Sequence, residues 1–325
     1  MPTVTFVTRQ ITRRWLDIAS IGKPDDVAER IRSGVDVWII STFLELCARA
    51  RSLPFRVAIS DRFPPGEAAV AHRDDLRLKA AYWRSMVAGV RADRAPIYTA
   101  SREIVQSPHQ SDEGGAHIPS WPQPGLKPRE SQRQGVHMLS YFGRPVGLPA
   151  FYGDPDFCAE LYRRGVTLAV NHHDWRDYSA TDACIALRDP RAVDVGRKPS
   201  AKLVNAWLAG VPALLGAEPA YRALRRTELD YLEVASASDI LAALDVLRRD
   251  PGRYRAMVEN GRRRSEAFTR DKIADKWIAF LTGFVAALDA WRPMPQRALL
   301  GRLARQWVAK RRARTSRSRP TPAPP

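Results

Sequence analysis

The sequence has few of the features that mark secreted or membrane-spanning proteins. It contains only three cysteines among 325 residues, and this odd number of widely spaced thiols excludes a disulfide framework and fits a reducing compartment. No run of about 18 apolar residues is present that would form a transmembrane helix. The N-terminus also lacks the basic stretch and apolar run of a secretory signal. We therefore expect a cytoplasmic protein.

Acidic residues are scarce relative to basic ones. The chain has 52 Lys and Arg against 35 Asp and Glu, a formal net charge of +17. Nine of the cations and no acid lie in residues 297–325, which leaves +8 for the rest of the chain. A basic balance of this size favours anionic partners such as phosphorylated ligands, nucleic acid or anionic lipid.

Strand-like and helix-like segments alternate in residues 1–107, which predicts right-handed crossovers and a parallel sheet. The expected strands are residues 4–7, 35–40, 55–59 and 97–98. The expected helices are residues 25–31, 43–51 and 76–90. Residues 108–135 are rich in proline and glycine, as is typical of a linker between lobes.

A second alternating block begins at residue 136 and predicts a second parallel sheet. Its expected strands are residues 136–142, 166–170, 183–187 and 211–215. Its expected helices are residues 155–164, 200–209 and 238–248, with a further one starting after Pro251. Apolar residues three or four positions apart between Ile273 and Trp291 predict a long amphipathic closing helix. We therefore expect an α/β protein with two Rossmann-like lobes that face a cleft.

Ligands of parallel α/β sheets bind beyond the carboxyl ends of the strands, and in the first lobe this nominates residues after the strand at 55–59. We expect Asp61 or Glu67 to be the catalytic carboxylate that deprotonates an acceptor hydroxyl, with Arg62 on the acceptor side. An ion pair between Asp61 and Arg62 explains their types equally well. His72, expected at the start of a helix, is a weaker candidate.

In the second lobe the same rule nominates Gly143, Arg144 and Arg188. The helix expected at 200–209 adds Lys198 and Lys202 near its N-terminus, where cations are unfavourable unless an anion such as phosphate is bound. A solvated basic face is an equally weighted alternative for these lysines. No metal site is expected, because adjacent histidines at a strand end, His172 and His173, point in different directions.

Residues 202–213 resemble the nucleotide-sugar helix of family 4-like glycosyltransferases of the GT-B architecture. Residues 140–144, which end in Gly-Arg, resemble the first strand of that family's second lobe. Residues 248–261 are similar to its late pattern of Asp-Pro followed by Met-x-x-Asn-Gly. The family's paired glutamates fall here at Arg197 and Asn205, a departure from the pattern.

The resemblance implies a division of the chain and a set of donor-binding residues. The implied segments are an acceptor lobe at 1–107, a linker at 108–135, a nucleotide-sugar-binding lobe at 136–275, a helix crossing back to the first lobe at 276–296, and a basic, disordered tail at 297–325. The diphosphate would be held by Gly143, Arg144, Arg188, Lys198 and Lys202. Asn205 would bind hydroxyls of the ribose or sugar.

The function expected from these features is transfer of a sugar from a nucleotide-diphosphate donor to an acceptor hydroxyl, in glycan or polysaccharide synthesis. No cofactor or metal is expected, since the cations would assist departure of the diphosphate. A non-catalytic GT-B-like protein that binds glycans or nucleotide sugars is the first alternative. A basic nucleic-acid-associated protein is the second, and charge is its only support.

The basic tail leaves three interpretations open. Its apolar residues, among them Leu299, Leu300, Leu303 and Trp307, share one helical face flanked by cations. Such a helix can lie on an anionic membrane at its cytoplasmic face, and basic tails also bind nucleic acid without sequence preference. An unstructured solubilising extension is the third interpretation.

Overall fold

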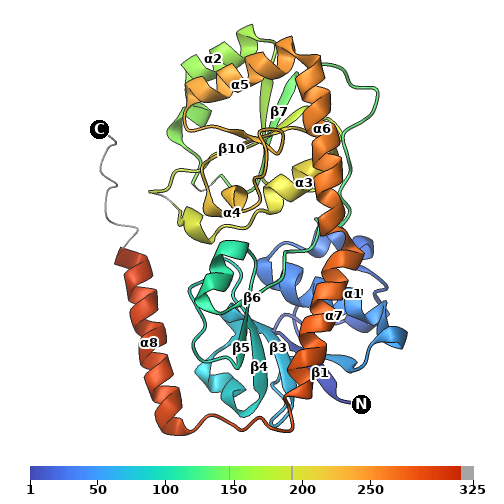
Figure 1. The fold of residues 1–325 in the computed structure, drawn as a ribbon, viewed down its shortest axis with the longest axis vertical. Coiled ribbons are helices and arrows are strands. Elements are labelled where there is room, and N and C mark those ends of the chain that lie inside the picture. Colours follow the sequence, from blue (N-terminus) through green and yellow to red (C-terminus); the bar gives the residue numbers. More distant parts are fainter. Residues whose placement is uncertain (146, 192, 316–325) are drawn as a thin grey trace. The chain divides into compact units, whose positions relative to one another are not determined.

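A computed structural model describes residues 1–145, 147–191 and 193–315, with residues 112, 113, 296 and 309–315 described by their backbone alone. The chain forms two compact units (Figure 1). Of the described residues, unit 1 combines Met1–Pro124 with Arg270–Thr315, and unit 2 is the continuous segment Gly125–Thr269. The Pro/Gly-rich stretch expected to be a linker is thus divided between the two units.

Unit 1 is built on a six-stranded sheet in which every pair of neighbours is parallel. Its strands are β1 (Thr3–Val7), β2 (Arg56–Ser60), β3 (Ala68–His72), β4 (Met86–Val90), β5 (Arg102–Val105) and β6 (Ala116–His117). They lie in the order β2-β1-β3-β4-β5-β6. The strand order therefore reverses between β1 and β3, which is where ligands of such sheets bind.

Residues 35–40, expected to be a strand, are helical. The chain turns as a π-helix at Asp36–Ile40 and continues as α1 (Ser41–Cys47). The buried Asp36 carboxylate fixes the start, because it accepts the backbone N–H groups of Arg32 and Ser33 at 3.1 and 3.0 Å. A short apolar run reads the same in a buried helix and in a buried strand, so the sequence pattern could not separate the two.

The segment expected to be a helix at 76–90 is also different. It contains two short 3-10 turns and then β4, and the strand expected at 97–98 is a loop that precedes β5. The two turns are Leu78–Ala80 and Tyr82–Arg84. Further 3-10 helices occupy Ile18–Ser20, Pro24–Arg30, Ala50–Ser52, Arg73–Asp75, Pro108–Glu113, Ala150–Gly153, Val195–Arg197 and Glu266–Phe268.

Unit 2 is built on a five-stranded parallel sheet in the order β11-β10-β9-β7-β8. Its strands are β7 (Met138–Phe142), β8 (Thr167–Asn171), β9 (Ala183–Ala186), β10 (Ala213–Leu215) and β11 (Leu232–Glu233). Its helices are α2 (Pro155–Arg163), α3 (Ala201–Ala209), α4 (Pro219–Arg222), α5 (Ala237–Arg249) and α6 (Pro251–Ser265). Alternate residues of β9 pack on opposite faces: Ile185 joins the core that contains α2 and α5, and Cys184 joins the one that contains α3.

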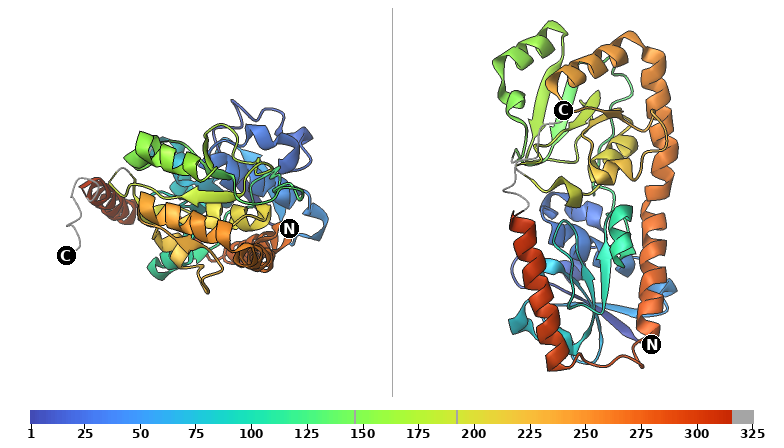
Figure 2. Two further views of the ribbon diagram at one scale, coloured as in Figure 1. Left: turned by 90° about the horizontal axis from the view of Figure 1, so that it is seen from above. Right: turned by 60° about the vertical axis from the view of Figure 1, so that its left-hand side comes forward.

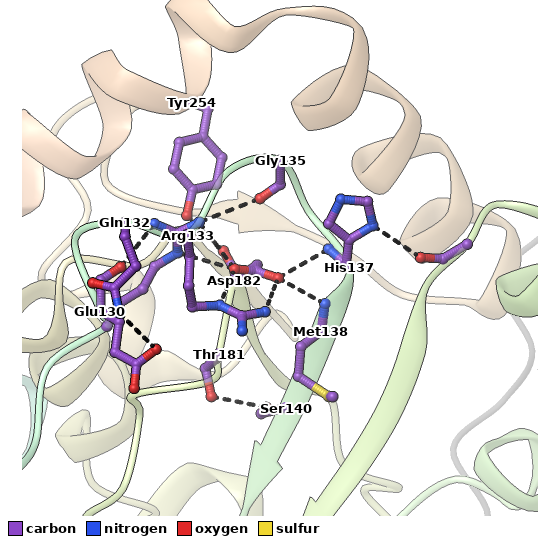
Figure 3. Close-up of polar contacts among 12 residues, drawn as sticks. Glu130, Gln132, Arg133, Gly135, His137, Met138, Ser140, Thr181, Asp182 and Tyr254 are labelled. Carbon is purple, nitrogen blue, oxygen red and sulfur yellow. Dashed lines mark hydrogen bonds and ion pairs between the residues drawn. The ribbon is translucent and has the colours of Figure 1, made fainter.

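The segment that leads into β7 is fastened to unit 2 by the buried carboxylate of Asp182 (Figure 3). Asp182 accepts hydrogen bonds from the guanidinium groups of Arg129 and Arg133 at 3.0 and 2.8 Å. It also accepts the backbone N–H groups of His137 and Met138 at 3.0 and 2.9 Å. Residues 129–138 are therefore held against the amino end of β9.

Two helices of the last part of the chain flank the unit 1 sheet on opposite sides (Figures 1 and 2). On α7 (Arg270–Ala286), the Trp277 indole is fully buried, with its ring centroid 6.4 Å from those of Phe6 and Trp38. The second is α8 (Gln296–Thr315). The expectation of a disordered tail is therefore wrong for residues 297–315, and residues 316–325 lie outside the described part of the chain.

Candidate functional site

The candidate site in unit 2 lies at the carboxyl end of β7, where the chain turns at Gly143. Gly143 has a φ of +150°, and a Cβ atom placed on it would lie 3.0 Å from the Lys202 Nζ and 3.1 Å from the Tyr141 hydroxyl oxygen. Lys202 reaches this point from the first turn of α3, and its Nζ lies 5.1 Å from the centroid of the Tyr141 ring. The absence of a side chain at residue 143 thus keeps the lysine ammonium close to the turn.

A second cation reaches the same region from the end of β9. The Arg188 guanidinium is buried and donates to both carboxylate oxygens of Glu218, to Oε1 at 2.6 Å. It also lies 3.4 Å from the Tyr221 hydroxyl. Glu218 immediately precedes α4, so this ion pair ties the loop after β9 to the loop after β10. The pair fixes the direction of the guanidinium and uses a carboxylate whose charge also acts on Lys202.

The charge of Lys202 is poorly compensated in this environment. Burial, together with the positive charges of Arg188 and Lys198, lowers the pKa of the Lys202 ammonium to about 7, against the opposing influence of Cys184 and Glu218. The protonated form of Lys202 is therefore less favoured than that of an exposed lysine. A bound anion would reverse this, because an opposite charge within a few ångströms favours the protonated form.

The other residues expected at the donor site take different positions. Arg144 follows Gly143 and is exposed, while its carbonyl oxygen accepts the Tyr141 hydroxyl at 3.2 Å. Lys198 precedes α3 and acts on Lys202 through its charge. Asn205 is buried and its side chain bonds the Tyr178 phenol, whose pKa is raised by burial. The structure thus brings Gly143, Arg188 and Lys202 together and turns Asn205 toward the core.

In unit 1 the structure separates the residues that were expected to act together. Asp61 and Arg62 are exposed just after β2, the edge strand, at the carboxyl end of the sheet. Glu67 precedes β3, which runs parallel to β2, so it lies at the opposite, amino end. No ion pair joins Asp61 to Arg62, both of which are described, and the Arg62 N–H bonds the Ser60 hydroxyl at 3.0 Å. Glu67 therefore cannot share a site with Asp61 at the carboxyl edge.

Two buried groups that the sequence did not single out as partners are His72, the last residue of β3, and Asp75, in the turn that follows it. The Nδ1 atom of His72 accepts the backbone N–H of Asp74 at 3.2 Å, which places the proton on Nε2, and Nε2 has no partner. One Asp75 carboxylate oxygen accepts the Arg9 Nε at 3.0 Å, and the other has no partner. The side chain of His72 lies against Gly34, whose added Cβ would be 3.3 Å from Nε2.

Burial lowers the pKa of the His72 imidazole, and the charge of Arg94 lowers it further against Asp74 and Asp75. A neutral N–H donor and a carboxylate oxygen thus remain unused at the centre of the unit 1 sheet. The one signal for them in the sequence was the run of small apolar residues at 68–71, which has the length of a buried strand. Buried polar atoms without partners are rare.

The late sequence pattern at 257–261 positions the helix that carries Lys202. Asn260 donates to the Asp230 carboxylate at 3.0 Å, and the Trp207 indole donates to the Asp230 carbonyl at 2.9 Å. A Cβ atom at Gly261 would lie 2.8 Å from the Trp207 ring, so only glycine allows α6 to approach α3 this closely. The Asn-Gly pattern therefore has a structural role: it packs α6 against α3 and holds α3 in position.

Among the residues that the structure describes, no group of three or more His, Cys, Asp or Glu side chains is arranged to hold a metal ion. In the same part of the chain, no helix combines the length and the apolar character needed to cross a bilayer.

Comparison with known proteins gives a match of structure alone. No family profile and no curated protein sequence matches the chain. Sucrose-phosphate synthase from Thermosynechococcus elongatus is similar over 88% of this chain and all of its own, with a TM-score of 0.54 and 13% identity. HepE from Anabaena, solved in complex with UDP, is similar over 87% of this chain and all of its own, with a TM-score of 0.52 and 13% identity. The same protein was also solved with UDP-glucose.

These matches confirm the predicted fold class, since both proteins are glycosyltransferases of the GT-B architecture. At 13% identity the likeness concerns the fold and not the individual site residues. The chain thus has the GT-B fold, with successive parallel sheets of six and five strands flanked by helices.

Proposed function

We propose that the protein is a glycosyltransferase that binds a nucleoside-diphosphate sugar at the carboxyl edge of the unit 2 sheet. The observation that carries the proposal is the placement of Lys202 beside the side-chain-free turn at Gly143, with Arg188 fixed nearby by Glu218. The likeness to HepE, which was solved with UDP and with UDP-glucose, supports the same ligand class.

The chemistry of the site suits a diphosphate. Lys202 lies in the first turn of α3, so its charge adds to the partial positive charge of the helix N-terminus. Lys198 adds a further positive charge to this region, and Arg144 adds another at the turn. These groups would hold the diphosphate and stabilise the negative charge that develops on it as the sugar leaves. In this proposal the cations perform the role that a metal ion has in other phosphate chemistry.

The acceptor side of the proposal rests on unit 1. His72 and Asp75 present an N–H donor and a carboxylate oxygen without partners near the point where the strand order reverses. An acceptor hydroxyl that reached either atom would satisfy it. Asp61 lies at the same edge of the sheet but on its outermost strand, so it becomes the weaker choice for the base.

Binding of a nucleotide sugar to paired variants tests the donor site. Lys202→Met and Arg144→Ala should each weaken binding about ten- to a hundredfold, because a charge-assisted hydrogen bond contributes about 1.5–3 kcal/mol. Lys127→Ala is the matched control, since Lys127 is an exposed lysine of the same unit that pairs with Asp177 at 3.3 Å. Screening UDP, GDP and their sugars by thermal shift identifies the ligand first. Unchanged affinity in both site variants would refute the assignment.

A non-catalytic nucleotide-sugar-binding protein is the second candidate. It is favoured by one observation: the two carboxylates nominated for catalysis, Asp61 and Glu67, lie at opposite ends of the unit 1 sheet. The two candidates differ in turnover. A transferase releases nucleoside diphosphate from the bound donor when acceptors are supplied, and a binding protein returns the donor intact.

A further inference from the structure

The rotation of α8 about its axis is fixed by polar contacts with residues 96–99 of unit 1. The Gln306 side chain donates to the Pro96 carbonyl at 2.9 Å and accepts the Tyr98 N–H at 3.3 Å. The Arg302 guanidinium donates to the Tyr98 carbonyl at 3.4 Å. Leu299 lies on the same side of the helix and is only 6% exposed. One face of α8 is therefore turned inward and the remainder outward.

The outward part of α8 carries large apolar side chains. Leu300 is 67% exposed, Trp307 56% and Val308 41%. At 100° per residue, Leu300 and Trp307 lie about 20° apart around the helix, with the exposed Ala304 about 40° and Val308 about 80° from Leu300. The structure thus corrects the view from the sequence that all the apolar residues form one face, because Leu299 turns inward and Leu300 does not.

Cations are frequent along the sequence of α8, and no acid accompanies them. The basic residues of α8 are Arg297, Arg302, Arg305, Lys310, Arg311, Arg312 and Arg314. The absence of Asp and Glu from residues 296–315 disfavours a basic partner, and a second copy of this helix would be repelled in the same way. A surface of this composition is complementary to a partner that offers negative charge together with an apolar interior.

We propose that α8 is a membrane-surface helix that lies on anionic phospholipid. Leu300, Trp307 and Val308 would enter the boundary between headgroups and acyl chains, and the arginines beside them would contact the lipid phosphates. Nucleic acid would satisfy the cations but would leave the three apolar side chains in water. The surface is independent of the nucleotide-sugar site, since it belongs to unit 1 and the donor residues belong to unit 2.

Flotation with lipid vesicles tests this proposal on the full-length chain. The probes are vesicles of about 70% phosphatidylcholine and 30% phosphatidylglycerol, and vesicles of phosphatidylcholine alone, at an ionic strength of about 0.15 M. The unaltered protein should float with the anionic vesicles and much less with the neutral ones. The double variant Arg297→Gln/Arg305→Gln should bind about 25-fold more weakly, at roughly fivefold per charge.

A second pair of variants tests the apolar stripe. Leu300→Gln/Trp307→Gln keeps every charge and should reduce binding at least tenfold, because it removes the groups that enter the bilayer. Its matched control is Leu16→Gln/Leu78→Gln, which alters two exposed leucines of unit 1 that are not on α8. That control should bind the vesicles as the unaltered protein does. Circular dichroism confirms that all variants stay folded.

Three results would overturn the proposal. The first is that the unaltered protein stays with the soluble fraction in the presence of anionic vesicles. The second is that the apolar variant floats as well as the unaltered protein, so that charge alone accounts for binding. The third is that duplex DNA at equal phosphate concentration displaces the protein from the vesicles while the apolar variant binds that DNA unchanged, which would identify a nucleic-acid surface.

Discussion

Lys202 has little negative charge in unit 2 to balance it, because Glu218 is already paired with Arg188. An ammonium whose pKa burial has lowered to about 7 is a sensitive reporter of a nearby anion. Binding of a diphosphate should raise that pKa, and the proton needed must come from the buffer. The donor site is thus testable by its proton balance as well as by its affinity.

We expect binding of a nucleotide sugar at pH 7.5 to take up between about one half and one proton per molecule. The same linkage predicts that affinity falls as the pH rises above about 7, where the free protein loses the Lys202 proton. Isothermal titration calorimetry in two buffers of different ionisation enthalpy measures the uptake. A nucleotide sugar is the better ligand, because the terminal phosphate of a free nucleoside diphosphate itself titrates near pH 6.

Lys202→Met should abolish the uptake, and Lys127→Ala should leave it unchanged. Heats of binding that are identical in the two buffers for the unaltered protein would show that Lys202 does not face the bound anion.

The unpartnered His72 nitrogen leads to a prediction for transfer. His72→Asn keeps an acceptor for the Asp74 N–H and removes the Nε2 donor, so it separates the local role of the ring from its possible contact with an acceptor. We expect release of nucleoside diphosphate from the best-bound donor to slow at least tenfold, with donor affinity nearly unchanged. His172→Gln, at an exposed histidine of unit 2, is the control. Equal losses of transfer and donor binding would instead mark His72 as structural.

At the scale of elements, buried carboxylates hold the connecting segments onto the sheets. Asp36 anchors the helix after residue 33 in unit 1, and Asp182 anchors residues 129–138 in unit 2 (Figure 3). Burial raises the pKa of the Asp182 carboxyl, but the hydrogen bonds from Arg133 and from the N–H groups of His137 and Met138 outweigh it and keep the pKa below its ordinary value. The network should therefore contribute to stability mainly when Asp182 is ionised.

Asp182→Asn tests this contribution. Removing one partner of a buried ion pair costs about 3–5 kcal/mol, and we expect the lower end because both arginines keep some contact with water. The folded-state pKa lies below the unfolded value of about 3.9, so the stabilisation is complete above that value and is lost as the pH falls through the folded-state pKa. Urea unfolding at pH 7 and near pH 3 should show that the difference in the free energy of unfolding between the two proteins becomes smaller in acid. A difference that is the same at both pH values would contradict this account.

At the scale of the whole molecule, one unit is formed by a continuous segment of the chain and the other by two segments that are distant in sequence. Unit 2 is continuous from Gly125 to Thr269 and contains every residue proposed to bind the donor. Unit 1 needs the distant helix α7, since Ile273, Trp277 and Leu281 are fully buried in its core. The order of the sequence thus predicts that one unit can be isolated and the other cannot.

A fragment of residues 125–269 should fold cooperatively and bind the nucleotide sugar, with affinity reduced by Lys202→Met as in the full chain. A fragment of residues 1–124 should fail to fold, because it exposes the apolar surface that α7 covers. Circular dichroism, urea unfolding and calorimetry measure these outcomes. If the first fragment folds but binds no nucleotide sugar that the full chain binds, the donor site requires unit 1.

The fold class could be predicted because alternating strands and helices leave few arrangements other than parallel sheets with right-handed crossovers. The strand-end rule also placed Gly143 and Arg188 in one region, since it depends on order along the chain and not on details of packing. Lys202 was added by its place near the N-terminus of the helix expected at 200–209. The two ends of α3 could also be predicted, because Ser200 and Gly210 are local start and stop signals. In the structure Gly210 is the C-cap, with a φ of +71°.

The other features, namely the conformation of residues 35–40 and the positions of Glu67, Asn205 and α8, could be known only from the tertiary structure. They depend on which residues pack against them. Residues 35–40 became helical since their apolar side chains face α7 and the sheet together, and a short buried run has no periodicity of its own to report this. Glu67 lies at the amino end of the sheet because residues 68–72, which follow it, form a strand that was not predicted from the sequence. The Asn205 side chain bonds the Tyr178 phenol in the core. The hydrogen bond from Gln306 to the Pro96 carbonyl determines which side of α8 faces outward. The sequence determines the order and the chemical type of these residues. The direction in which each side chain points depends on the residues that pack against it in the folded protein.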